Sequence, residues 1–493
     1  MSACRALEAR FREIADIEGA LAVLHWDQQV MMPPGGAEVR GEQVATLERI
    51  AHERLVDPAV GDWLAAAAGE GQDPWRAANL REMRRHHLHA VAVPPDLVAA
   101  LARAAARAEQ AWRRARAEAD FALMEPGLRE VLALVREKAR AKAEALGLDL
   151  YDALLDGFEP GMRTATVDRL FEPLEARLPH LLEQVLERQG DAPPPLPGAL
   201  PVGEQKALGE RLMERLGFDF TRGRLDESLH PFCGGVPDDI RLTARYDHDV
   251  ASGLMAILHE TGHALYNGAL PREWRGQPVG EARSTAVHES QSLLIEMQVC
   301  RSLPFQHLLA PRLQAAYGDP DHPALAPGAL YRRAIRVGRG LIRVDADEVT
   351  YPLHVILRYR LERAMIEGRL EVLDLPEAWN EGMAALVGAV PPNDAQGCLQ
   401  DIHWPGGAFG YFPCYTLGAL MAAQLAAAIR RAIPDLDEQI AAGDFAPLRH
   451  WLREQIHERG CLLETGDLLL EATGEELSAT PFLDHLCARY LNS

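Results

Sequence analysis

The sequence predicts an all-α fold, mainly helical, with one small β element. Long segments repeat their apolar residues at helical spacing, and Ala, Leu, Glu and Arg, which are good helix formers, dominate them. Strand patterns are few, and segment 238–246 has the clearest. The 493 residues, 48% hydrophobic and 25% charged, have the composition of a soluble globular protein that buries a large core without disulfides.

Residues 97–121 illustrate the helical pattern. Two prolines precede Asp96, a residue type that often caps helix N-termini, so we expect the helix to begin there. Apolar side chains then recur every three or four positions, at Leu97, Leu101, Ala104, Ala108 and Trp112. The same pattern predicts helices at 128–147, 165–190, 417–432 and 447–457.

The predicted strand, 238–246, alternates between two faces. Its apolar set is Ile240, Leu242 and Ala244, and its polar set is Arg241, Thr243 and Arg245. The proline-rich stretch Ala192–Pro201 predicts a stiff connector. Because helical patterns lie on both sides of it, it is either a domain boundary or a loop within one domain.

Charge and cysteine usage limit the possible partners and location. The net charge of -21 argues against nucleic acid, which requires a basic face, and against anionic membranes. The seven cysteines are scattered and include no CxxC pair, which favours free thiols in a reducing compartment. The N-terminus lacks a signal-peptide pattern, and no run of about 18 apolar residues predicts a spanning helix. We therefore expect a cytoplasmic protein that binds no membrane.

The clearest chemical motif is His259-Glu260-Thr261-Gly262-His263, within the apolar run Leu254–Leu265 that predicts a buried helix. Histidines at i and i+4 project from one helical face, so His259 and His263 can bind one zinc ion. Glu260 lies beside them, where a carboxylate can take a proton from water. Gly262 lowers helix propensity only modestly.

A catalytic zinc ion needs a third protein ligand, and the next helical stretch supplies Glu289, 26 residues after His263. That length lets the chain leave the first helix, turn through Gly276–Gly280 and return antiparallel. His288 and Glu296 are alternatives. A third histidine in the HExxHxxGxxH pattern is excluded, because Ala269 occupies its position.

Three further segments contain more polar residues than a helical core needs. They are Asp239–Thr243, Ile342–Tyr351, and Gly397–Trp404, which runs on through Gly406–Tyr415. Taken singly, each has an ordinary structural explanation, because an Arg beside an Asp commonly forms a salt bridge and a Gly/aromatic stretch commonly forms a packed loop.

Together these blocks resemble the carboxypeptidase Taq family of zinc metallocarboxypeptidases. The resemblance rests on HETGH, HESQS, DIRLT, IRVDAD and GCLQDIHW in the family's typical spacing. It extends to Leu24–Gln28 with Met32–Ala37, to Tyr151–Asp156 with Glu159–Gly161, and to Glu471–Glu475 with Tyr490. Val30 and Val349 depart from the family pattern, which has Thr and Leu there, and neither is a candidate site residue.

The resemblance implies a nearly all-helical protein with a deep groove and a gluzincin-type HExxH metal site at its floor. It implies removal of single C-terminal residues from peptides, with broad specificity and poor action at proline. It implies one zinc ion per chain, which cobalt or another divalent metal can replace, and a homodimer. It also makes residues 1–493 one domain with a catalytic core at roughly 225–420, so that Ala192–Pro201 becomes a loop.

The resemblance assigns roles to individual residues. His259, His263 and Glu289 hold the metal, and Glu260 is the general base for attack by water. Tyr411 is the first choice for stabilising the oxyanion, with Tyr415 and His403 as alternatives.

Arginine suits the free C-terminal carboxylate of the substrate, because its planar fork binds carboxylate bidentately. Arg343 is favoured. Arg241 is second, since it is also placed to pair with Asp239, and its strand is a candidate for pairing with the substrate backbone. His230 is expected to line the site. Asp345, Asp347 and Asp401 are expected to orient ligands or arginines.

Two rival functions remain open. A dipeptidyl carboxypeptidase or an endo-oligopeptidase shares HExxH, a distant Glu and a helical groove. A non-catalytic metal-binding protein could keep the fold, although the presence of Glu260 argues against it.

Overall fold

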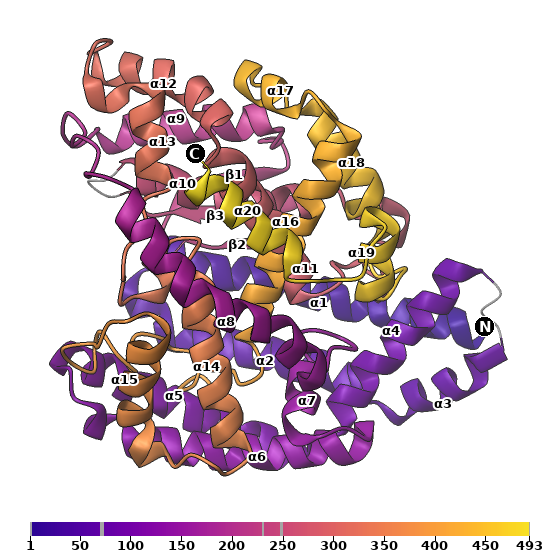
Figure 1. Ribbon diagram of the computed structural model, residues 1–493. Helices are drawn as coiled ribbons and strands as arrows, with labels where there is room; N and C mark the ends of the chain where they lie inside the picture. The colour runs from indigo at the N-terminus through magenta and orange to yellow at the C-terminus, as the bar shows by residue number, and fades with distance from the viewer. Residues whose placement is uncertain (1, 70–72, 229–230, 247–249, 493) are drawn as a thin grey trace.

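The computed structural model describes residues 2–69, 73–228, 231–246 and 250–492, and helices dominate it (Figure 1). The first half contains α1 Ala3–Val30, α2 Ala37–Leu55, α3 Pro58–Ala66, α4 Pro74–Val91, α5 Pro95–Glu118, α6 Glu125–Leu146, α7 Leu150–Leu155, α8 Thr164–Arg188 and α9 Val202–Leu216. The second half contains α10 Val250–Gly268, α11 Thr285–Leu293, α12 Leu303–Tyr317, α13 Pro327–Ala334, α14 Tyr351–Ile366, α15 Leu375–Leu386, α16 Pro413–Ala432, α17 Leu436–Ala442, α18 Ala446–Gln455, α19 Thr465–Thr473 and α20 Thr480–Leu491. The predicted helical class is confirmed.

Each predicted helix is present, with small differences at its ends. The segment expected at 97–121 is α5, and Ala104, Ala108 and Trp112 on its apolar face are buried. The expected cap is wrong, because α5 begins earlier, at Pro95, and Asp96 lies in its first turn. Proline at the first helical position loses no hydrogen bond, which accounts for the earlier start.

A three-stranded sheet contains the predicted strand at its centre. It has the order β1-β3-β2, with β1 (Gly223–Glu227) parallel and β2 (Cys233–Val236) antiparallel to β3 (Asp239–Ala244). β3 therefore has no free edge, and the expectation that it pairs with a substrate backbone is wrong. The buried face of the sheet packs on α10 through Leu242, Ala244 and Ile257.

One large hydrophobic core spans most of the chain. It contains Val185 of α8 and Leu208 of α9, so it continues on both sides of the loop Ala192–Pro201. The N-terminal helices α1, α3 and α4 have a smaller core of their own, which includes Leu7, Val60 and Met83.

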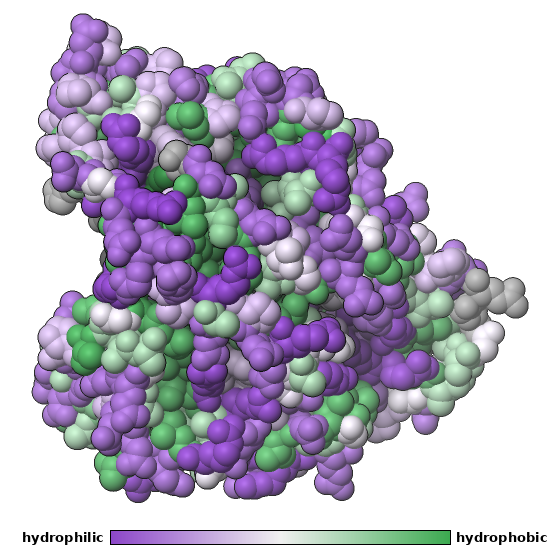
Figure 2. Space-filling view, in the orientation of Figure 1, coloured by the Kyte–Doolittle hydropathy of each residue, from purple (hydrophilic) through white to green (hydrophobic). Residues whose placement is uncertain are grey.

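The surface in Figure 2 is mainly hydrophilic, with scattered apolar patches. Among the described residues, no single helix is long and apolar enough to cross a membrane. Helices α4 and α5, which are bent by 76° relative to each other, have the length and composition of a membrane span only when they are taken together.

The C-terminal helix α20 is fixed to the rest of the molecule by Glu348, which is 4% exposed. Its carboxylate accepts hydrogen bonds from Arg489 (2.9 Å) and the Tyr490 hydroxyl (3.2 Å) and contacts His485 Nε2 at 2.8 Å. Burial raises the pKa of Glu348, but the charges of Arg489 and His485 outweigh burial and lower it to about 2.

We expect Glu348 to make the protein acid-sensitive. Its pKa is lower in the folded chain than the ordinary value of 4.5. The Glu348 carboxylate therefore contributes fully to the free energy of unfolding above about pH 4.5. This contribution, about 3 kcal/mol in total, is lost as pH falls through the folded pKa. Glu348→Gln should lower the free energy of unfolding at pH 7 by a similar amount. It should also reduce the loss of this free energy at acid pH, the acid limb of the stability profile, as measured by urea unfolding between pH 7 and 3.

Glu53→Gln, which removes an exposed ion pair with Arg49, is the control and should change the free energy of unfolding little. An unchanged acid limb in Glu348→Gln would contradict this account.

Candidate metal centre and active site

Two packed helices carry the HExxH residues and Glu289. A Cβ added to Gly262 of α10 would lie 2.5 Å from the carbonyl oxygen of Gln291 in α11, so the helices touch backbone to backbone there. Farther along α10, the hydroxyl of Tyr266 accepts a hydrogen bond from the Arg283 N–H, just before α11. These contacts run in opposite directions along the two helices, which confirms the antiparallel return. This close contact explains why a glycine occupies position 262, because any side chain there would push α11 away.

Three donor groups converge between these helices. Glu289 Oε2 lies 3.5 Å from His263 Nε2 and 3.9 Å from His259 Nε2. The candidate ligand atoms of all three residues lie within 4.8 Å of one another, so together they could hold a metal ion. Two imidazoles and one carboxylate form a typical donor set for catalytic zinc.

The alternative ligands His288 and Glu296 lie behind this set. Glu296 Oε2 contacts His259 Nδ1 at 2.9 Å, and the His288 carbonyl contacts His263 Nδ1 at 3.1 Å. The His288 ring stacks on His263, and its Nε2 contacts Asn267 instead. With the Nδ1 atoms engaged in this way, both Nε2 atoms are left to face Glu289, an arrangement common around metal-binding histidines.

The electrostatics of this set favour a positive charge at its centre. Burial raises the pKa of Glu289, but its hydrogen bond to His263 and the two histidine charges lower it to about 2. Burial lowers the pKa of His259, yet its carboxylate neighbours raise it to about 10; these are Glu296, Glu289 and Glu260. Burial also raises the pKa of Glu260 above its usual value, opposed by the two histidines. A divalent cation bound by these residues would supply the positive charge that the surrounding carboxylates favour. The residues present therefore fit a metal ion.

The candidate oxyanion residues form an aromatic cluster next to Glu289. The rings of Tyr411 and Tyr415 pack edge to face with their centroids 5.2 Å apart, and His403 Nε2 contacts the Tyr415 hydroxyl at 3.2 Å. Tyr351, which sequence reasoning left without a role, donates to Glu289 Oε1 at 3.5 Å. Burial, followed by the charge of Glu289, raises the pKa of Tyr351. Only its place at the end of the block Ile342–Tyr351 pointed to it.

Arg343 contacts the same aromatic cluster through Tyr415. Its side chain is 7% exposed, its Cζ lies 4.7 Å from the Tyr415 ring centroid, and its Nε and Nη2 donate to Asp401 Oδ1 at 3.1 and 2.9 Å. Asp401 Oδ2 accepts from Arg358 at 2.6 Å. Arg358 is fully buried and was missed, since it lies within α14 and outside every motif. Asp401 thus orients two arginines, as expected for one of the three aspartates.

Arg241 belongs to a separate group of contacts. It is paired with Asp239 at 3.0 and 2.8 Å and lies over the Trp26 ring of α1 at 4.4 Å. His230, the remaining candidate, lies outside the described residues.

The other two aspartates expected to orient ligands or arginines differ from Asp401. Asp347 accepts hydrogen bonds from the Gly338 and Thr350 N–H groups at 3.0 Å each, so it fixes the backbone around α14. Asp345 lies in the short turn that begins at Arg343.

The whole chain is similar to known carboxypeptidases. It matches the family described as Carboxypeptidase Taq (M32) metallopeptidase over residues 6–490. Thermostable carboxypeptidase 1 of Thermus thermophilus is 40% identical, with 97% of this chain and 96% of that protein covered. The protein of the same name from Pyrococcus furiosus is 36% identical, with 98% and 97% covered. The solved structure of Trypanosoma cruzi metallocarboxypeptidase 1 superposes with a TM-score of 0.97 at 39% identity, over 99% of each chain. Because these similarities span the chain, the protein belongs to the carboxypeptidase Taq (M32) metallopeptidase family and is a metallocarboxypeptidase, a hydrolase that acts on peptides.

Proposed function

We propose that this metallocarboxypeptidase removes single amino acids from peptide C-termini with broad specificity, using His259, His263 and Glu289 as metal ligands and Glu260 as general base. The convergence of the three donor groups beside Glu260 carries the proposal. We further propose zinc, one ion per chain, with cobalt or another divalent metal able to replace it. Such an ion supplies Lewis acidity to water and to the scissile carbonyl.

The residues of the chain perform the remaining steps. Glu260 takes the proton from the attacking water and passes it to the leaving amine nitrogen. Tyr411 donates a hydrogen bond to the developing oxyanion. Burial, with Tyr415 and Glu289 adding to it, raises the pKa of Tyr411 above its usual value, so the hydroxyl keeps its proton and remains a donor at neutral pH.

Arg343 is proposed to bind the C-terminal carboxylate of the peptide. Asp401 engages its Nε and Nη2, which leaves Nη1 without a hydrogen bond to any described residue. Arg241 is the second candidate.

The resemblance also supports a homodimer in the cytoplasm, one domain over 1–493 with a catalytic core at roughly 225–420, and a groove with the metal at its floor. The seven cysteines are free thiols, which suits a reducing compartment.

Mass spectrometry of a defined peptide tests the activity. We expect a ladder of products that lose one residue at a time, abolished by chelator and restored by zinc or cobalt. Release of dipeptides or internal cuts would instead indicate a dipeptidyl carboxypeptidase or an endo-oligopeptidase, and no cleavage would indicate a metal-binding protein without catalysis.

Replacing Arg343 with Met tests the carboxylate clamp. We expect kcat/KM for a peptide with a free C-terminus to fall by about 10²-fold, because a charged hydrogen-bond partner is lost, and cleavage of the amidated peptide to change far less. Arg241→Met is the matched variant and should discriminate less between the two peptides. Equal losses on both peptides would remove Arg343 from this role, and a selective loss in Arg241→Met would assign the role to Arg241.

A further inference from the structure

The segment Tyr151–Gly161, which comprises α7 and the turn after it, has no role in the proposed chemistry. It nevertheless contains three buried carboxyl groups. Asp152 and Asp156 are each 7% exposed, and Glu159 is fully buried. Burying a carboxyl group is costly unless hydrogen bonds compensate it, so the partners of these groups indicate what the segment does.

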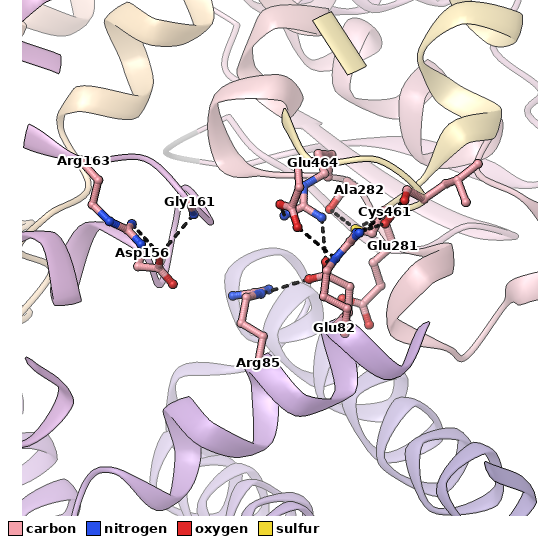
Figure 3. Close-up of polar contacts among 12 residues, drawn as sticks. Glu82, Arg85, Asp156, Gly161, Arg163, Glu281, Ala282, Cys461 and Glu464 are labelled. Carbon is pink, nitrogen blue, oxygen red and sulfur yellow. Dashed lines mark hydrogen bonds and ion pairs between the residues drawn. The ribbon is translucent and has the colours of Figure 1, made fainter. Parts of the chain in front are cut away.

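The turn after α7 is held in one shape by Asp156. Its carboxylate accepts hydrogen bonds from the Gly161 N–H (3.1 Å) and from Arg163 (2.8 Å), as Figure 3 shows, and it contacts His89 Nε2 at 3.0 Å. The N–H of Glu159 donates to the Leu155 carbonyl at 2.8 Å. Glu159 is therefore presented in a fixed position.

Glu159 and Phe158 meet the N-terminus of α11, the helix that carries Glu289. The first N–H groups of a helix have no partners within it. Here the Thr285 N–H donates to the Phe158 carbonyl at 3.1 Å, and the Ala286 N–H donates to Glu159 Oε2 at 3.0 Å. The turn thus satisfies two consecutive donors at the start of α11, one turn before Glu289.

Other segments hold the same end of α11. Ser284 caps the helix through its hydroxyl, which accepts from the Val287 N–H at 3.1 Å. Arg283, just before this cap, is paired with Glu82 of α4 and with Glu464, two residues labelled in Figure 3. Contacts at the N-terminal end of α11 therefore fix the position of this helix along its axis.

The same segment also contacts the residues before Tyr411. The ring of Phe158 packs edge to face on Tyr411 at 5.1 Å. Gly410 has φ +88°, and a Cβ added there would lie 2.9 Å from the backbone of Leu154 and Leu155. Tyr411 thus rests on α7 and its turn, which also contact the start of α11.

We infer that Glu159 is a positioning residue for the metal ligand Glu289, and that the turn Asp156–Gly161 sets the spacing between Glu289 and Tyr411. The inference rests on the proposed function only through the assignment of Glu289 as ligand. A carboxyl oxygen accepts the Ala286 N–H whether or not the group is ionised, so the geometry predicts that an amide can replace the carboxyl. Burial raises the pKa of Glu159 to about 7, consistent with a role that does not need the charge.

The test measures cobalt binding to the full chain by chelator competition, together with the visible absorption of bound cobalt. In Glu159→Ala we expect about 10-fold weaker binding or more and an altered spectrum, because misplaced ligands typically cost 10–100-fold in affinity. Glu159→Gln should stay within about 2-fold of the parent, since its amide oxygen can accept the same N–H.

Asp152→Ala is the matched control. Asp152 lies in the same segment and accepts the Thr164 N–H of α8 at 2.7 Å, which is an equivalent bond on a helix that carries no candidate site residue. It should lower thermal stability and leave cobalt affinity unchanged. Parent-like binding in Glu159→Ala, or an equal loss in Asp152→Ala, overturns the inference.

A conservative variant keeps the test decisive if Glu159→Ala does not fold. Glu159→Asp retains the carboxyl but withdraws it by one methylene, so we expect weaker cobalt binding than in the parent. Parent-like affinity in this variant would overturn the inference. A protein that binds cobalt and cleaves no peptide contradicts the proposed function and leaves this inference standing. A parent protein that binds no cobalt overturns both.

Discussion

Replacing Glu260 with Gln is expected to reduce kcat by roughly 10²-fold or more while metal binding is retained. The amide has nearly the shape of the carboxyl group but cannot accept the proton of the attacking water. Glu260 is 8% exposed and is separate from the three donor groups, so the substitution leaves those groups in place. Steady-state kinetics on the defined peptide and metal content after dialysis measure the two effects.

A matched substitution separates loss of the base from loss of the metal. Glu289→Gln changes the same functional group on the facing helix and should lower metal affinity as well as rate. If Glu260→Gln remained fully active, the general base would have to be another residue. If it lost the metal, the effect on rate would say nothing about proton transfer.

Replacing Tyr411 with Phe is expected to lower kcat by about 10²-fold with little change in KM, because an oxyanion donor acts mainly in the transition state. The rings of Tyr411 and Tyr415 pack against each other with their centroids 5.2 Å apart, so both hydroxyls are candidates. Tyr415 is also engaged by His403, and the Arg343 guanidinium lies over its ring. These contacts leave Tyr411 as the better placed donor.

Tyr415→Phe is the control with the same change of chemistry. It should affect KM more than kcat, since Tyr415 supports Arg343, the proposed carboxylate clamp. A larger fall of kcat in Tyr415→Phe would transfer the donor role to Tyr415. Parent-like kcat in both variants would point to His403.

Local sequence patterns predicted the helices well. The buried residues Ala104, Ala108 and Trp112 of α5 follow a spacing that depends only on helix geometry. The central strand β3 was found because one of its faces is buried and the other is polar. β1 and β2 were missed: β2 has two adjacent glycines, and β1 is five residues long with no regular alternation.

Site residues that lie close together in the sequence could be predicted, and those whose partners lie far away in the sequence could not. The pair His259 and His263 follows from i, i+4 spacing on one helix. Arg358 and Tyr351 escaped notice because their partners, Asp401 and Glu289, lie 43 and 62 residues away in the chain. Spacing along the chain does not report such contacts.

The sequence by itself determined the helical class, the histidine pair beside Glu260 and, through its blocks, the family. These features are local, or they recur as fixed strings. The tertiary structure decided that Glu289 faces the histidines while His288 and Glu296 stand behind them, and that Arg343 rather than Arg241 lies beside the tyrosines. It also decided that the segment Tyr151–Gly161 meets both α11 and Tyr411. The physical reason is that these outcomes depend on how helices distant in sequence pack, including the backbone contact at Gly262, and one-dimensional spacing cannot encode that packing.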